Sequence, residues 1–186
     1  LRTTRLVRTQ GDCSFLDCSY HTRDDQLEHI KAQIDMNLKN KIISVIGLGR
    51  TGVATANFLS VRGAKVSIMD NKSRDQLSEL ASQLLPDVDV VYENCAPHPD
   101  SKMIVISPGV GIESNFLKNA RQSGVEIISE IELASRINNS PLIGITGTNG
   151  KSTCTSLIGE ILNESGTKAA VGGNLGIPFI SLLDQE

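Results

Sequence analysis

Residues 41–63, KIISVIGLGRTGVATANFLSVRG, decide the fold. Their first part, 41–46, is rich in β-branched residues and predicts a strand buried on both faces. Apolar residues then recur at helical spacing before a glycine, which predicts a helix over 53–63 with Val53, Phe58 and Val61 facing inward. A strand, a glycine-rich turn and a helix in this order make one unit of a parallel α/β fold.

The turn between this strand and helix, GLGRTG, has the G-x-G-x-x-G spacing of nucleotide-binding turns. Gly47 permits a tight turn, Gly49 lets the backbone approach a ligand, and Gly52 lets the helix pack against the strand. Asp70, at the end of the next predicted strand, can accept hydrogen bonds from a hydroxyl or an imide N–H. The turn therefore predicts a nucleotide-like ligand, with NAD as the usual candidate; glycines that serve only close packing are the alternative.

The alternation of strands and helices continues to about residue 138. Ser73 and Gln76 form a capping box that predicts the start of the second helix, which should stop before Pro86. Further strands are predicted at 65–70, 88–92, 102–106 and 125–128, and further helices at 73–85, 114–124 and 130–137. This order predicts a Rossmann-like domain over residues 37–138, with a parallel sheet covered by helices on both faces.

A second glycine loop lies within residues 141–157, PLIGITGTNGKSTCTSL, between a predicted strand and a predicted helix. Lys151 can reach the β and γ phosphates of a nucleoside triphosphate, and the Ser152 hydroxyl can ligate Mg²⁺. The loop is a variant of the usual phosphate loop, because Ile145 stands where the first glycine is expected. It predicts a nucleoside triphosphate as a ligand and Mg²⁺ as its companion ion.

The segment around this loop predicts the start of a second domain over residues 139–186. A strand at 141–145, a helix at 151–166 and a strand at 168–171 cannot bury a core by themselves, so we expect this domain to be incomplete. The expected buried stripe of its helix consists of Leu157, Ile158, Ile161 and Leu162. Cys154 is expected to be a small core residue of the same helix rather than a nucleophile.

The composition excludes several classes of partner. A net charge of −3, a pI near 5.7 and only six aromatic residues give neither a basic surface nor stacking platforms for nucleic acid. No apolar run approaches the roughly eighteen residues that cross a bilayer, and the N-terminus lacks the apolar core of a signal peptide. We therefore expect a cytoplasmic protein without membrane or nucleic-acid partners.

Residues 1–36 carry mixed charges and few apolar residues, so we expect a poorly ordered extension of unknown role, with at most a short helix at 23–36. Two cysteines and two histidines in this segment are a ligand set that zinc accepts: Cys13, Cys18, His21 and His29. Their spacing fits no zinc template well, which favours an incidental cluster of reduced thiols and imidazoles.

The second glycine loop, GITGTNGKST, closely resembles the ATP loop of the Mur ligases, the ATP-dependent amino-acid ligases of peptidoglycan precursor synthesis. Within this family, other stretches follow in the order seen in the members that add D-glutamate. These stretches are VIGLGRTGVATANFL, MDNK, ISPGV, SEIEL and VGGNLGIP. The resemblance covers residues 37–185. It implies a Rossmann-like first domain that holds the UDP of the substrate and a central domain that holds ATP, so the two loops serve different nucleotides.

The resemblance also implies a role for particular residues. The UDP-substrate site would comprise Gly49, Arg50 and Thr51 along the diphosphate, Asp70, Asn71 and Lys72 near the uridine, Ser107, Pro108 and Gly109 beside the UDP, and Asn174 on the muramoyl substrate. The ATP site would comprise Gly147, Thr148, Asn149, Gly150, Lys151, Ser152 and Thr153. Lys151 would be the catalytic cation, and Ser152 would hold Mg²⁺.

The implied reaction joins D-glutamate to UDP-N-acetylmuramoyl-L-alanine through an acyl phosphate. Family members also need groups that follow residue 186, so we expect this chain to be a monomeric fragment that does not catalyse. Three alternatives stay open on the sequence: an NAD-binding module, a phosphate-loop kinase or ATPase, and another Mur or folylpolyglutamate-type ligase. Phosphate-loop kinases usually hold Mg²⁺ with an acid at the end of a later strand, which the sequence does not offer.

Overall fold

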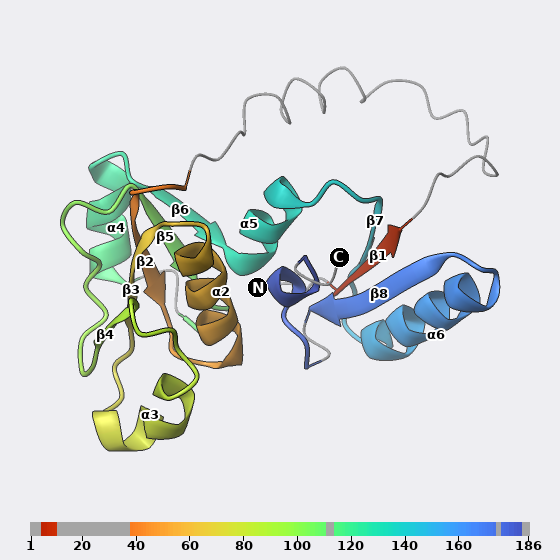
Figure 1. Ribbon diagram of the computed structural model, residues 1–186, viewed down its shortest axis with the longest axis horizontal. Coiled ribbons are helices and arrows are strands. Elements are labelled where there is room, and N and C mark those ends of the chain that lie inside the picture. Colours follow the sequence, from red (N-terminus) through yellow and green to blue (C-terminus); the bar gives the residue numbers. More distant parts are fainter. Residues whose placement is uncertain (1–4, 11–37, 111–113, 174–175, 184–186) are drawn as a thin grey trace. The chain divides into compact units, whose positions relative to one another are not determined.

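The computed structural model describes residues 5–10, 38–110, 114–173 and 176–183, and the chain divides into two compact units (Figure 1). The five-stranded unit consists of Asn37–Ser135 and Pro178–Glu186, and the three-stranded unit consists of Leu1–Met36 and Arg136–Ile177. The division at 135 lies close to the domain boundary expected near 138. The last residues, expected in the second domain, group instead with the five-stranded unit.

The sheet of the five-stranded unit is parallel throughout and has the strand order β4-β3-β2-β5-β6. Its strands are β2 (Ile42–Ile46), β3 (Lys65–Met69), β4 (Asp89–Val91), β5 (Met103–Ile106) and β6 (Glu126–Ser129). Strand β2 is central. The chain adds β3 and β4 on one side of it and then β5 and β6 on the other. This is the doubly wound arrangement, so the predicted Rossmann-like fold is confirmed.

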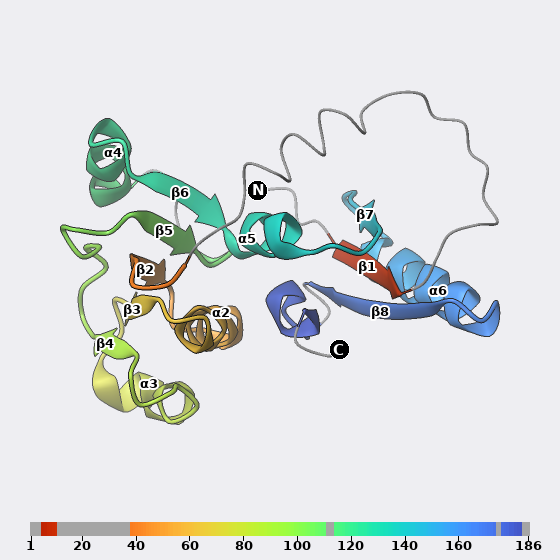
Figure 2. The same cartoon turned by 45° about the horizontal axis from the view of Figure 1, so that its top comes forward.

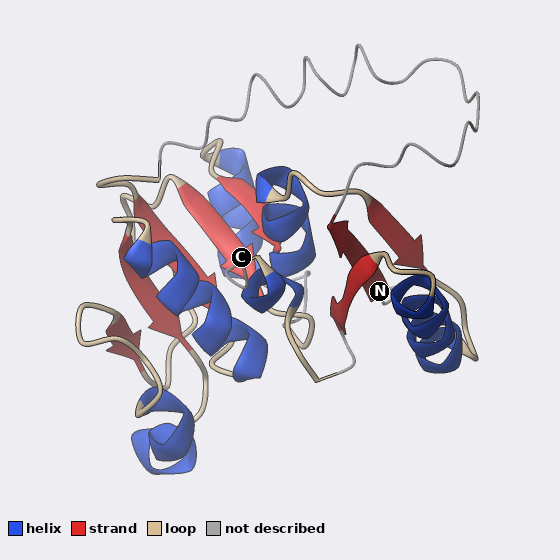
Figure 3. Ribbon diagram, turned by 45° about the vertical axis from the view of Figure 1, so that its right-hand side comes forward, coloured by secondary structure: helices blue, strands red, loops and turns tan. Residues whose placement is uncertain are grey.

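Helices cover both faces of this sheet (Figure 3). The helices of this unit are α2 (Arg50–Val61), α3 (Arg74–Ala81), α4 (Asn115–Gln122) and α5 (Glu130–Ile137), of which α3 packs against α2. On the face that α4 covers, Leu117 packs in a fully buried cluster with Ile46 and Ile104. On the other face α2 packs against β2 and β3. Burial on both faces is why these strands have continuous apolar runs.

The ends of the predicted helices differ from the observed ones for local reasons. Helix α2 begins at Arg50, three residues earlier than predicted, because Gly49 serves as its N-cap. Val53 and Phe58 are buried as predicted, but Val61 is 72% exposed. It lies two residues beyond the buried Leu59, about 200° around the helix, and therefore on the opposite face.

Three contacts that involve side chains fix the surroundings of α2 and α3. The Arg62 guanidinium lies over the Phe58 ring, 3.4 Å from its centroid. The predicted capping box is present at the start of α3, where the Ser73 N–H donates to Gln76 Oε1 over 3.2 Å. The Ser60 hydroxyl donates to Asp87 Oδ2 over 2.7 Å, so the end of α2 is tied to the turn before β4.

The segment 178–183 completes the five-stranded unit from the far end of the sequence. It contains the 3-10 helix η1 (Phe179–Leu182), which packs against α2. Phe179 and Ile180 are fully buried. The carboxylate of Glu130, 3% exposed, accepts a hydrogen bond from the Ile180 N–H over 2.7 Å. Burial raises the pKa of the Glu130 carboxyl, although the N–H groups of Ile180 and Phe179 oppose this shift.

The three-stranded unit has the strand order β7-β1-β8 (Figures 1 and 2). Strands β7 (Leu142–Ile145) and β8 (Lys168–Gly173) are joined by α6 (Lys151–Glu164), and β1 (Arg5–Gln10) lies antiparallel between them. The sequence did not predict β1, because its pairing depends on strands more than a hundred residues away. The expected helix at 23–36 and the cysteine and histidine cluster lie outside the described residues.

Helix α6 packs through small side chains rather than through the predicted apolar stripe. Thr155 and Gly159 are its buried residues, and a Cβ on Gly159 would lie 2.3 Å from Val171 Cγ2. Leu157 and Ile161 are 56% and 58% exposed, so the predicted stripe is wrong at these two positions. Cys154 is exposed and is not the core residue that was expected.

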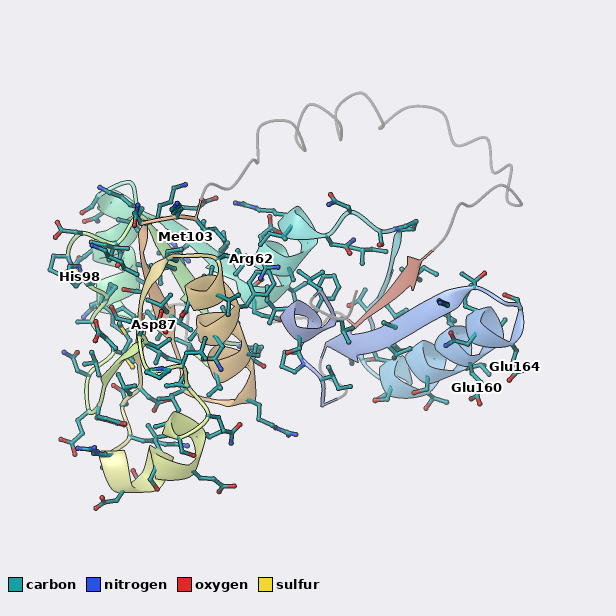
Figure 4. The ribbon with its side chains drawn as sticks, in the orientation of Figure 1. Arg62, Asp87, His98, Met103, Glu160 and Glu164 are labelled. Atoms are coloured by element: carbon teal, nitrogen blue, oxygen red, sulfur yellow. The ribbon has the colours of Figure 1, made fainter. Side chains whose placement is uncertain are left out.

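Figure 4 shows the exposed side chains of Glu160 and Glu164 projecting from α6, where they line a hollow together with Gly159 and with Val171 of β8.

Candidate functional site: two glycine loops

The first glycine loop, residues 47–52, lies where the strand order of the five-stranded sheet reverses, between the ends of β2 and β5. Gly47 has a φ of +100°, a conformation that L side chains rarely adopt. Ser107 follows β5 and ties the two strand ends together. Its hydroxyl donates to the Gly47 carbonyl over 3.1 Å, and its N–H donates to the Ile46 carbonyl over 2.9 Å.

The other two glycines of this loop have opposite surroundings. A Cβ on Gly52 would lie 1.9 Å from the Gly47 carbonyl oxygen, so the close packing expected at this position is confirmed. A Cβ on Gly49 would meet nothing within 4 Å. Gly52 is therefore required by the fold. Gly49 faces open space at the N-terminus of α2, where backbone N–H groups favour an anion.

Asp70 fixes the loop from the neighbouring strand. Its Oδ2 atom accepts a hydrogen bond from the Leu48 N–H over 2.8 Å, and its Oδ1 atom accepts one from the Lys72 N–H over 3.0 Å. The sequence predicted this carboxylate as a ligand contact but did not reveal that it holds the glycine loop. Each carboxylate oxygen has a second acceptor site, so these bonds leave capacity for a ligand.

The turn after β4, at residues 93–95, packs beside Asp70, a contact that the sequence did not indicate. The Glu93 N–H donates to the Lys72 carbonyl and the Asn94 N–H to the Asp70 carbonyl, each over 3.2 Å. Glu93 has a φ of +56°, which is uncommon for a residue other than glycine. The pKa of the Cys95 thiol is raised, first by burial and then by the negative charge of Asp70. The thiol therefore stays protonated near neutral pH and packs as an apolar side chain.

The structure brings most of the predicted UDP-site residues to one edge of the sheet. They follow β2, β3 and β5, three adjacent parallel strands whose C-terminal ends meet there. These residues are Gly49, Arg50, Thr51, Asp70, Asn71, Lys72, Ser107, Pro108 and Gly109. Asn174 lies outside the described residues.

The second glycine loop, residues 146–150, joins β7 to α6 and is exposed throughout. Gly150 is the N-cap of α6 with a φ of +73°, and a Cβ there would meet nothing within 4 Å. The Lys151 ammonium reaches back over the loop and donates to the Gly147 carbonyl and, over 3.2 Å, to the Thr148 carbonyl. The loop is therefore held by its own lysine.

The first turn of α6 is anchored below the loop. The Thr155 hydroxyl donates to the Lys151 carbonyl over 2.6 Å, and the Cys154 N–H donates to the Gly150 carbonyl over 2.9 Å. Ser152 is half-buried beside Lys151. This arrangement fits a phosphate group, because a cation, a helix N-terminus and unobstructed backbone meet at one place.

The described residues give two further observations about ligands and membranes. No three of their His, Cys, Asp and Glu side chains gather where they could share a metal ion. None of the helices in the described ranges combines the length and the apolar character that crossing a bilayer requires.

Comparison with known proteins adds independent findings. Residues 41–129 match the family described as Mur ligase MurD-like, N-terminal domain. Two curated relatives are named UDP-N-acetylmuramoylalanine--D-glutamate ligase. The protein of Koribacter versatilis is 44% identical over 149 residues, which is 78% of this chain and 33% of the relative. That of Geotalea uraniireducens is 47% identical over 152 residues, which is 80% of this chain and 33% of the relative.

This chain therefore spans about a third of the length of the curated relatives it matches. Among solved structures, shikimate dehydrogenase from Aquifex aeolicus is similar with a TM-score of 0.37 and 21% identity, over 60% of this chain and 50% of that chain. A similarity of this size says nothing about function.

Proposed function

The chain belongs to the Mur ligase family, with a MurD-like N-terminal domain at residues 41–129, and from this membership we propose that it binds the nucleotides of an ATP-dependent ligase. The proposed ligase joins D-glutamate to UDP-N-acetylmuramoyl-L-alanine, a step of peptidoglycan precursor synthesis. One observation carries the proposal: a chain that matches these ligases has two glycine loops, each at a strand-to-helix turn of a separate unit.

We assign the UDP group to the edge formed by the ends of β2, β3 and β5. The diphosphate would lie over Gly49, because this position is open and the N–H groups of the first turn of α2 are directed there. The uridine would lie toward Asp70 and Asn71, where carboxylate and amide groups can bind an imide or a hydroxyl. Ser107 and the two residues after it would contact the UDP from the other side.

We assign ATP to the second glycine loop. Its γ phosphate would displace the Lys151 ammonium from the carbonyl oxygens of Gly147 and Thr148, and the ammonium would then pair with the phosphate. The N–H groups of the loop and of the first turn of α6 would bind the phosphate oxygens. Mg²⁺, when bound, would neutralise part of the phosphate charge, and the Ser152 hydroxyl would hold it.

The proposed chemistry needs cations because two anions must meet. A carboxylate oxygen of the L-alanyl group attacks the γ phosphorus, and ADP leaves with the electrons of the broken P–O bond. The amine of D-glutamate then attacks the acyl carbon, phosphate leaves, and the amine proton passes to solvent. Lys151 would lower the repulsion in the first step and stabilise the charge that develops on the transferred phosphoryl group.

We further propose that the protein works in the cytoplasm as a monomer. Another Mur ligase or a folylpolyglutamate-type ligase would share the ATP loop. The match of residues 41–129, which include Ser107 and Gly109, to the MurD-like N-terminal domain favours the D-glutamate enzyme.

Calorimetric titration with UDP-N-acetylmuramoyl-L-alanine, with ATP and Mg²⁺, and with NAD tests the proposal directly, because it measures binding and does not require turnover. We expect the UDP compound to bind and NAD not to bind. Gly49→Val should abolish binding of the UDP compound and spare ATP, whereas Lys151→Ala should do the reverse. Tighter binding of NAD than of the UDP compound would overturn the proposal.

A further inference from the structure

Strand β1 has an unusual place in the three-stranded unit. It comes from Arg5–Gln10, whereas β7 and β8 belong to one continuous strand-helix-strand segment at 142–173. In the described strands β7 and β8 do not pair with each other, because β1 lies between them (Figure 2). The β7-α6-β8 segment therefore contains a gap that is one strand wide.

The pairing shows how this gap is filled. Residues 5–8 pair with β7 and residues 5–10 pair with β8, antiparallel in both cases. Helix α6 packs over β1 as well as over β8. Each N–H of a central strand points to one neighbour or the other, so β1 satisfies backbone groups that β7 and β8 would otherwise expose between them.

We propose that the gap between β7 and β8 is an acceptor site for an extended peptide, and that residues 5–10 are its occupant in this chain. Recognition would be through the main chain, as when a peptide adds a strand to a sheet, so the covalent connection through residues 11–37 is not required for binding. Residues 5–10 are thereby a structural part of the unit that carries the second glycine loop.

The register links this strand to the loop. Arg5 is paired with Ile145, the last residue of β7, and with Gly173, the last residue of β8. The pairing thus extends to the residue after which the second glycine loop begins. Loss of β1 should loosen β7 up to this point, whether or not the loop binds ATP.

The test is hydrogen exchange on the full chain without nucleotide, comparing Val7→Pro with Val7→Ala. Val7 pairs with Ile143 and with Val171. Proline removes the N–H and alanine keeps it. We expect Val7→Pro to speed exchange in 142–145 and 168–173 by about tenfold or more, and Val7→Ala to change it by less than about threefold. Exchange in Ile42–Ile46 of the other unit is the internal reference.

Adding the peptide RLVRTQ to the Val7→Pro chain tests the acceptor site itself. At roughly millimolar concentration it should restore protection in β7 and β8, whereas the same peptide with proline in place of valine should not. Unchanged exchange in Val7→Pro, equal losses in the two variants, or no rescue by the peptide would each overturn the proposal. None of these readouts depends on the proposed ligase activity.

Discussion

The two glycine loops use the same residue type for different physical purposes. In the first loop, Gly52 leaves no room for a Cβ, and Asp70 and Ser107 bind the loop backbone from adjacent strands. In the second loop, a Cβ on Gly150 would meet nothing within 4 Å, and the main contact is the loop's own Lys151. The first loop is therefore fixed by bonds from neighbouring strands of its unit, whereas the second is exposed and is held mainly by its own lysine.

The largest difference in stability between the two loops should come from Gly52→Ala in the first loop. The new Cβ would clash with a backbone carbonyl that cannot move without disturbing β2, so we expect a loss of about 3 kcal/mol or more in the free energy of unfolding. Urea denaturation followed by a probe in the five-stranded unit measures this loss.

Gly49→Ala is the matched control within the same loop. It introduces the same methyl group into open space at a φ of −108°, so stability should change by less than about 0.5 kcal/mol. A similar loss in both variants would show that the loop is generally intolerant and that Gly52 has no special packing role.

Asp70→Ala should have the next largest effect. It leaves the Leu48 N–H without its acceptor, which should cost about 1–3 kcal/mol of stability, and Asp70→Asn should cost less because one acceptor oxygen remains. The matched variant in the second loop, Lys151→Ala, should change stability by less than about 0.5 kcal/mol because its partners are exposed carbonyl groups. Equal losses for Asp70→Ala and Lys151→Ala would remove the distinction between the loops.

A third prediction concerns Glu130, which holds the segment 178–183 in the five-stranded unit. Burial raises its pKa above the ordinary value of 4.5, so the folded state keeps a proton that the unfolded state loses as pH rises. Its contribution to stability should therefore fall as pH rises from 4.5 through the folded-state pKa, and should be lost above it.

Two variants of Glu130 separate charge from hydrogen bonding. Glu130→Gln keeps an acceptor for the Ile180 N–H and should gain stability relative to the wild-type chain as pH rises from about 5 to about 8. Glu130→Ala should cost about 1–2 kcal/mol at about pH 5, because a buried N–H loses its partner, and this cost should shrink as pH rises because the buried charge destabilises the wild-type chain. Parallel pH profiles for Glu130→Gln and the wild-type chain would contradict the assignment of this pH dependence to Glu130.

The sequence predicted those features that depend on neighbours along the chain. The strand, loop and helix around Gly47, the capping box at Ser73 and the helix Glu130–Ile137 all follow from local pattern and were found. The predicted UDP-site residues that the structure describes lie at one edge of the sheet because they follow adjacent parallel strands, whose ends meet there.

The features that the sequence did not predict depend on contacts between distant segments. Strand β1 forms because it pairs with β7 and β8. The 178–183 segment is buried because it packs against α2 and because its Ile180 N–H donates to Glu130. The bond from Leu48 to Asp70 belongs to the same class. None of these has a local signature, since pattern shows that a residue is apolar or acidic but not which partner it meets.

The smallest expected effect tests the helix that follows the second loop. Leu157→Ala should change stability by less than about 0.5 kcal/mol, because Leu157 is 56% exposed and alanine favours a helix. The matched change Leu117→Ala, at a fully buried leucine of α4, should cost about 2–5 kcal/mol. A cost for Leu157→Ala close to that of Leu117→Ala would mean that this face of α6 is covered in solution. The helix that follows the second loop would then be packed as tightly as the helices of the five-stranded unit.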